Sequence, residues 1–95
     1  CAILVMGDQK ATDLDEYLYC DCSAAIQNIL IEARHQGLST CWCAVGPRKE
    51  RINNFRNYYK LKEDLLPVAV IAVGYGCEDK EIADRFDPDK ISYFD

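Results

Sequence analysis

Cysteines are the residues of this 95-residue chain whose type and spacing could do chemistry. Four of the six form two Cys-x-Cys pairs, Cys20 with Cys22 and Cys41 with Cys43, and four thiolates can hold zinc tetrahedrally. Structural zinc sites usually place two to four residues between paired cysteines on a turn, whereas Cys41 and Cys43 flank Trp42 in a strand-like run. We therefore predict no metal site, and a thiol metal-binding protein stays open as an alternative.

The cysteines could also act as nucleophiles or form disulfides. A thiol nucleophile needs a base, and the only histidine, His35, lies near the end of a predicted helix, where it complements the helix dipole. Disulfide scaffolds are typical of secreted domains, but we interpret the apolar residues 1–6 as a strand rather than a secretory signal. We expect free thiols in a reducing cytoplasm.

The acidic composition argues against two classes of partner. Lys and Arg number 11 against 16 Asp and Glu, which gives a net charge of −5, and the chain has no basic stripe to contact nucleic-acid phosphates. The longest apolar stretch, residues 65–73, contains a proline and is far shorter than the ~20 residues that a membrane span needs. We expect neither a nucleic-acid nor a membrane partner.

Three apolar runs predict strands. Residues 2–6 and 68–73 are continuous apolar runs, which are typical of strands buried on both faces. Residues 38–45 predict a strand in which Cys41 and Cys43 share one face. Parallel and antiparallel pairing both remain open, because buried strands of either kind have the same pattern.

The first predicted helix covers residues 21–37. Its apolar residues recur at spacings of three and four, Asp21 or Ser23 can cap its first amides, and Gly37 can end it in the left-handed conformation. Apolar residues outside the main face, such as Ile31, indicate that this helix packs on two sides.

The other segments complete an alternation of strands and helices in one layered unit. Residues 8–16 are polar and predict a surface connection or a short capped turn. Pro47 is expected in the first turn of a second helix that runs to about Tyr58. Residues 77–95 are acidic and predict an extended arm.

Several stretches, taken in order, resemble the C-terminal half of the FMN-dependent nitroreductase family. They are DCSAAIQNIL at 21–30, GLSTCW at 37–42 and LPVAVIAVGY at 66–75, followed by RF at 85–86 and SY at 92–93. The resemblance implies an α+β sandwich with a central mixed or antiparallel sheet, flanking helices and a C-terminal extended arm. It also implies that residues 1–95 are the C-terminal portion of a single domain whose N-terminal portion is absent from this chain.

The resemblance further implies an FMN-dependent oxidoreductase that passes hydride from NADH or NADPH through the flavin to a small organic acceptor. In such proteins the cofactor binds at the interface of a homodimer. The residues expected at the flavin are Trp42, Cys43, Ala44 and Val45, through their backbone amides, and Arg85, through the FMN phosphate. We expect no catalytic side chain, because the flavin carries the redox chemistry. A flavin-free dimerising α/β module is the second hypothesis.

Overall fold

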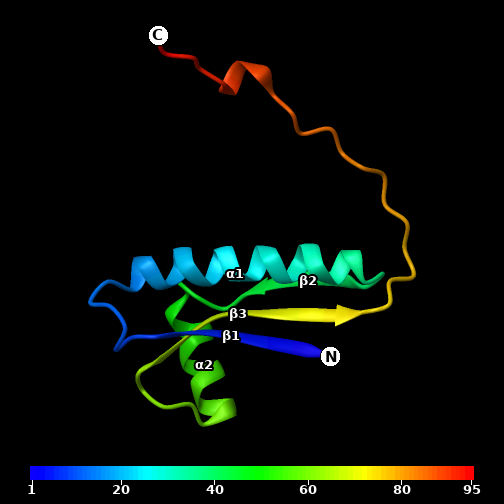
Figure 1. The fold of residues 1–95 in the computed structure, drawn as a ribbon. Helices are drawn as coiled ribbons and strands as arrows, with labels where there is room; N and C mark the ends of the chain where they lie inside the picture. The colour runs from blue at the N-terminus through cyan, green and yellow to red at the C-terminus, as the bar shows by residue number, and fades with distance from the viewer.

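The computed structural model describes the whole chain, residues 1–95. Three strands and two helices form a body from which the C-terminal residues extend as an arm (Figure 1). Their bounds are β1 (Ala2–Asp8), α1 (Asp15–His35), β2 (Ser39–Ala44), α2 (Lys49–Tyr59) and β3 (Leu65–Gly74). The α1 helix runs along one side of the sheet and α2 lies on the other, so the α+β architecture expected from the sequence is confirmed (Figure 1).

The sheet has the order β1-β3-β2, and both pairs of neighbours are antiparallel. The last strand in the sequence is therefore the central one. Ala72 of β3 lies between Ala2 of β1 and Cys41 of β2, and the register with β1 shifts between Val5 and Met6. The structure thus settles the strand direction, which the apolar patterns had left open.

Only one face of the sheet is covered along its length. Ile26 of α1 and Ile71 of β3 are both fully buried and belong to one core cluster. Ala2 and Ile3 are exposed, so the prediction of a strand buried on both faces is wrong for β1. In β3 it holds for residues 66–69, which are all buried, and fails at Ala72, which is exposed. The reason is that α1 covers one face, whereas α2 packs mainly against β3 and touches β2 only at its end, through Arg51.

The α1 helix starts at Asp15, earlier than the predicted residue 21, so the expected polar connection is shorter. Leu14 is the N-cap residue and makes no side-chain cap hydrogen bond, so the prediction of a cap at Asp21 or Ser23 is wrong. The acidic side chains of the first turn, Asp15 and Glu16, stabilise the helix because they lie at the positive end of its dipole. Leu18 then packs against β3, a tertiary contact that local spacing does not reveal.

The end of α1 agrees with the prediction. Gly37 has a φ of 77°, the left-handed conformation that a glycine adopts without steric cost. Its amide donates a hydrogen bond to the carbonyl of Arg34. The chain can therefore leave the helix and enter β2 within a few residues.

The α2 helix begins at Lys49, after an N-cap at Arg48, so Pro47 precedes the helix instead of lying in its first turn. The Gly46–Pro47 peptide bond is cis. Ile52 is the buried residue of α2, and it joins the second core cluster. That cluster comprises Leu18, Val45, Ile52 and Leu66.

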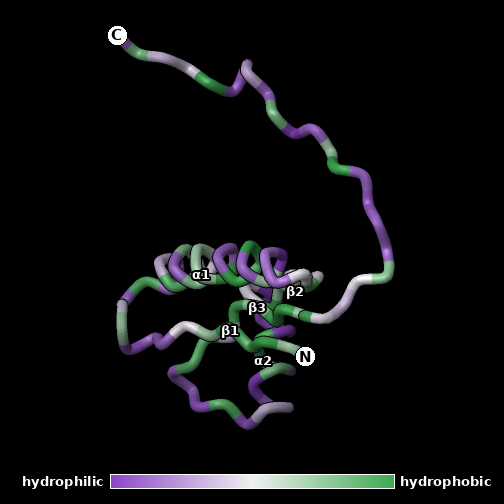
Figure 2. Tube along the Cα trace, turned by 45° about the vertical axis from the view of Figure 1, so that its right-hand side comes forward, coloured by the Kyte–Doolittle hydropathy of each residue, from purple (hydrophilic) through white to green (hydrophobic).

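The arm after β3 carries a single 3₁₀ turn, Pro88–Lys90, and no other regular element. Figure 2 shows hydrophobic positions concentrated in the strands and scattered singly along the mostly hydrophilic arm. Ile82 is 99% exposed and Phe94 is 93% exposed, so the arm leaves large apolar side chains without cover in the single chain. The extended arm predicted from the sequence is confirmed. Neither helix of the body combines the length and the apolar character that crossing a membrane requires.

Candidate functional site

The candidate site lies along β2, which forms one of the two free edges of the sheet. The amides of Val45 and Gly46 both donate to the carbonyl of Val68, at 3.0 and 3.1 Å. Amides point alternately toward and away from the partner along an antiparallel strand. Counting back from Val45, the amides of Trp42 and Ala44 point toward the open edge.

An arginine from α2 closes the end of this edge. Arg51 donates from Nη1 to the carbonyl oxygen of Ala44 at 2.9 Å. The carbonyl of Ala44 therefore points outward, in agreement with the alternation. The contact fixes the first turn of α2 to the end of β2 and places a guanidinium beside the amide of Ala44.

Side chains of β2 divide between the two faces of the sheet. Trp42 lies opposite Ile71 in the register, on the face that α1 covers, and its side chain is 38% exposed. Cys41 and Cys43 lie opposite Ala72 and Val70, on the other face, as the predicted strand required. All six cysteines of the chain are free thiols.

The two thiols of β2 interact with each other. The Sγ atom of Cys43 donates to Sγ of Cys41 across 3.9 Å. This hydrogen bond, followed by the charge of Cys41, raises the pKa of the Cys43 thiol above its usual value. In the structure no group of three or more His, Cys, Asp or Glu side chains is placed to hold a metal ion.

Arg85 lies away from the other expected site residues. It belongs to the arm, which runs away from the body (Figure 1), and it makes no ion pair. The neighbouring acids are engaged elsewhere: Asp84 accepts from the amide of Phe86, and Asp87 pairs with Lys90 at 3.6 Å. The structure therefore brings Trp42 to Val45 together as one segment but does not add Arg85 to it within one chain.

Two arginines near the site were not anticipated from the sequence. Arg51 is described above, and Arg56 of α2 donates to the carbonyls of Leu65 and Glu63 and to Oε1 of Gln9. Arg56 thereby joins three segments of the chain. Its only sequence signal is its position beside Phe55, next to the apolar face of the helix.

The largest of the described cavities, about 650 Å³, lies between the start of α1 and α2. Its walls include Tyr19, Asn53 and Arg56. Burial, followed by the charge of Asp15, raises the pKa of the Tyr19 phenol. The guanidinium of Arg56 is already hydrogen-bonded to backbone carbonyls, so its role in this cavity is to stabilise the fold.

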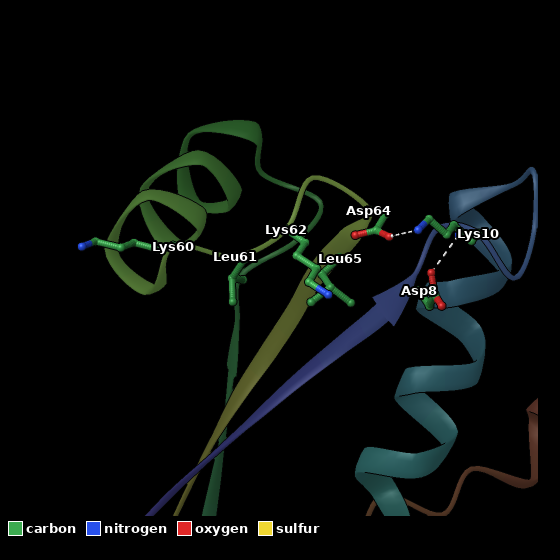
Figure 3. A pocket seen from close by; sticks show the side chains of 7 residues that line it. All are labelled: Asp8, Lys10, Lys60, Leu61, Lys62, Asp64 and Leu65. Carbon is green, nitrogen blue, oxygen red and sulfur yellow. Dashed lines mark hydrogen bonds and ion pairs between the residues drawn. The ribbon is translucent and has the colours of Figure 1, made fainter.

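A second cavity, of about 460 Å³, lies where β1 ends and β3 begins. Three lysines line it, but Lys10 is paired with Asp64 at 2.7 Å, and Lys60 points away in the close view (Figure 3). Lys62 is thus the one lysine there whose charge is neither paired nor directed outward. This cavity does not form a concentrated cationic site.

Comparison with known proteins shows to which family this α+β fold with a C-terminal arm belongs. The sequence model of a protein family, described as "Nitroreductase family", matches residues 1–75. The chain belongs to the nitroreductase family.

Relatives support this membership. A protein of Methanothermobacter thermautotrophicus, provisionally named NADH dehydrogenase/NAD(P)H nitroreductase, is 37% identical over 90 residues, which are 95% of this chain and 47% of that protein. A crystal structure with the same provisional name, from Bacteroides thetaiotaomicron, is 40% identical and superposes with a TM-score of 0.88. The superposition covers 97% of this chain and 53% of the B. thetaiotaomicron chain. The chain thus spans about half the length of these relatives.

The fold extends to more distant proteins. The FMN-dependent nitroreductase of Clostridium difficile R20291 superposes with a TM-score of 0.86 at 24% identity, over 97% of this chain and 56% of that one. At this identity the likeness shows the fold alone.

Proposed function

We propose that this chain is the C-terminal portion of an FMN-dependent oxidoreductase that moves hydride from NADH or NADPH to a small organic acceptor. The family match over residues 1–75 is the observation that carries the proposal. The provisional name of the M. thermautotrophicus relative, which includes NAD(P)H nitroreductase, supports the reaction class. The resemblance of residues 21–30, 37–42 and 66–75 to FMN-dependent nitroreductases supports the choice of flavin.

The open edge of β2 fits the polar rim of a flavin ring. The flavin, when bound, supplies the hydride chemistry, and the protein supplies binding and orientation. The amides of Trp42 and Ala44 are directed outward and are proposed to donate hydrogen bonds to that rim. The amide of Val45 donates a hydrogen bond to the carbonyl of Val68. By the alternation along the strand, the amide of Cys43 also points toward β3, so both amides pair β2 with β3.

Arg85 is proposed to bind the phosphate of FMN. A guanidinium can bind a phosphate through two parallel hydrogen bonds, and Arg85 has no ion pair within the chain. Its arm projects away from the body (Figure 1), so the phosphate that it contacts is proposed to lie in the site of a second copy. With this arrangement FMN is proposed to lie at the interface of a homodimer.

The outward side of α1 supplies a surface for that homodimer. Tyr17, Ala24 and Ile31 recur every seven residues on this side, and all three are exposed. Ile31 is 60% exposed in the single chain. Burying such a stripe against a second copy adds apolar area that a body of this size lacks.

No catalytic side chain is proposed, since no side chain of the segment from Trp42 to Val45 is an acid or a base poised for proton transfer. The six free thiols support the proposal that the protein works in a reducing cytoplasm. The second hypothesis, a flavin-free dimerising module, predicts the same fold and dimer without bound flavin.

A hybrid protein tests the function. This chain is substituted for the 90 matching residues of the M. thermautotrophicus relative, and the hybrid is purified in the presence of FMN. We expect a yellow dimer whose flavin is bleached by NADH or NADPH and reoxidised by a nitroaromatic acceptor. A folded dimer that retains no flavin would establish the flavin-free module instead.

A pair of proline variants in the hybrid tests the edge amides. Ala44→Pro removes an amide that points to the open edge, where proline is tolerated, and should weaken FMN binding about tenfold. Thr40→Pro removes another amide of β2 that also points to the open edge but lies outside the proposed flavin segment. This variant should leave FMN affinity unchanged. Equal losses in the two variants would count against the assignment of Ala44.

A further inference from the structure

Cys41 and Cys43 form a pair of thiols whose side chains the proposed function does not use. They lie on the face of the sheet opposite to α1, beside Val70 and Ala72, and both are exposed. The period of two in a strand sends both side chains to the same side. Their Sγ atoms are therefore held 3.9 Å apart without any turn or loop.

This separation is close to the sulfur–sulfur distance of two thiolates that bind the same tetrahedral cation. Sulfur lies about 2.3 Å from Zn²⁺ in such sites, so two sulfurs at the tetrahedral angle are about 3.8 Å apart. The observed 3.9 Å needs almost no side-chain movement to reach that value. The strand has thus already placed two ligands for a soft cation.

Oxidation to a disulfide fits the pair less well. A disulfide requires its sulfur atoms to approach to about 2.05 Å, with Cα atoms usually 4.4 to 6.8 Å apart. Residues two apart in a strand have Cα atoms about 6.6 Å apart, at the long end of that range. Closing the bond would bend β2 away from its ladder with β3, whereas binding a cation would not.

We propose that Cys41 and Cys43 form a two-thiolate chelate for a thiophilic d¹⁰ cation such as Zn²⁺ or Cd²⁺. Each thiol releases its proton to solvent, each sulfur donates an electron pair to the cation, and no electron is transferred. Water fills the remaining coordination positions on the exposed side. The site adds to the oxidoreductase function and is independent of it, since it uses side chains and needs no flavin.

The chain contains its own matched control. Cys20 and Cys22 have the same spacing in the sequence, but they lie in α1, where residues two apart point in different directions. Cys20 is exposed, whereas Cys22 is half-buried and packs against the cluster that contains Ile26. Equal spacing therefore gives a chelating pair in the strand and none in the helix.

Titration of the reduced, metal-free 95-residue chain with Cd²⁺ tests the proposal. The thiolate-to-cadmium charge-transfer absorbance reports the bonds, and calorimetry gives the affinity. We expect wild type and the double variant Cys20→Ser/Cys22→Ser to bind one Cd²⁺ with equal affinity. We expect Cys41→Ser/Cys43→Ser to bind at least a hundredfold more weakly and to lose the charge-transfer band.

Two outcomes would overturn the site. One is Cd²⁺ binding that survives in Cys41→Ser/Cys43→Ser, and the other is binding that disappears in Cys20→Ser/Cys22→Ser. Circular dichroism of each variant checks the fold, which should be unaffected because Cys41 and Cys43 are exposed. Cys43→Ala alone, which keeps five thiols, repeats the test with a smaller change and should also lose the band.

Discussion

The phenol ring of Tyr19 on α1 lies so close to the backbone of Gly46 that a methyl group added there would stand 2.5 Å from the Tyr19 hydroxyl oxygen. Two further ring atoms of Tyr19 would lie within 2.9 Å of the same methyl group. Gly46 is buried and follows the candidate flavin segment directly. The position of the helix and the path of the site loop are therefore coupled through one pair of residues.

Gly46→Ala should destabilise the protein by about 1 to 3 kcal/mol, because the ring of Tyr19 must leave its place. Chemical denaturation measures the loss. Gly74→Ala is the matched control, since nothing lies within 4 Å of a methyl group at Gly74, and it should be close to neutral. In the double variant Tyr19→Ala/Gly46→Ala the cost of the alanine at Gly46 should largely disappear. Strictly additive effects would contradict the contact.

Ile31→Asp should lower the oligomeric mass of the chain. The substitution places a charge in the middle of the exposed apolar stripe of α1, where burial against a second copy would leave it without water. Analytical ultracentrifugation at micromolar concentration measures the mass. Asn57→Asp, which adds the same charge to an exposed position of α2 on the other side of the sheet, should remain associated. A wild-type chain that sediments as a monomer would contradict the dimer.

Arg85→Ala in the hybrid protein should weaken FMN binding about ten- to a hundredfold, because a charge-assisted hydrogen bond contributes roughly 1.5 to 3 kcal/mol. Affinity for riboflavin, which lacks the phosphate, should stay the same. Flavin fluorescence titration measures both ligands. Lys90→Ala is the control, since Lys90 is another cation of the arm but already pairs with Asp87. Equal losses for FMN and riboflavin would show that Arg85 acts on the arm as a whole.

Lys10→Gln should raise the pKa of Asp64 toward its usual value. The hydrogen bond from Lys10 lowers the pKa of Asp64, and the same contact raises the pKa of Lys10. The contribution of Asp64 to stability is therefore present above its unfolded pKa and is lost as the pH falls through the lower folded pKa. The contribution of Lys10 is present below its unfolded pKa and is lost as the pH rises through its raised folded pKa.

Carboxyl-carbon NMR titration of Asp64 measures this shift directly. The difference in Tm between wild type and Lys10→Gln should be constant near neutral pH and should vanish once the pH has fallen below the lowered pKa of Asp64. Lys60→Gln is the control, because Lys60 points away from Asp64 (Figure 3) and should leave its pKa unchanged. A similar shift in both variants would indicate a general effect of charge and not the ion pair.

The sequence predicted the parts of the fold that depend on local pattern. The buried face of α1, its end at Gly37 and the shared face of Cys41 and Cys43 all follow from periodicity or backbone preference. The start of α1 did not, because its first turns are polar and its one buried residue there, Leu18, gains its place from Val45 and Leu66. Such contacts join distant segments, and no local spacing encodes them.

The geometry of the candidate segment could not be predicted from the sequence. The resemblance indicated the segment from Trp42 to Val45, and its role at a flavin stays a prediction. Which amides face outward depends on the register between β2 and β3, which the sequence left open. The contact of Arg51 with the carbonyl of Ala44 depends on how α2 docks, and a lone arginine in an amphipathic helix gives no hint of it.

The central position of β3 sets the order in which this body can form. β1 and β2 pair only with β3 and not with each other, although both precede it in the chain. On the ribosome, neither ladder can close until Leu65–Gly74 has emerged, and Ala2 must then find Ala72 across the whole body. Until β3 is made, Ile26 of α1 lacks its core partners Val68 and Ile71. Chains that end before β3 therefore lack both of these ladders, and their exposed apolar segments make them targets for chaperones and proteases.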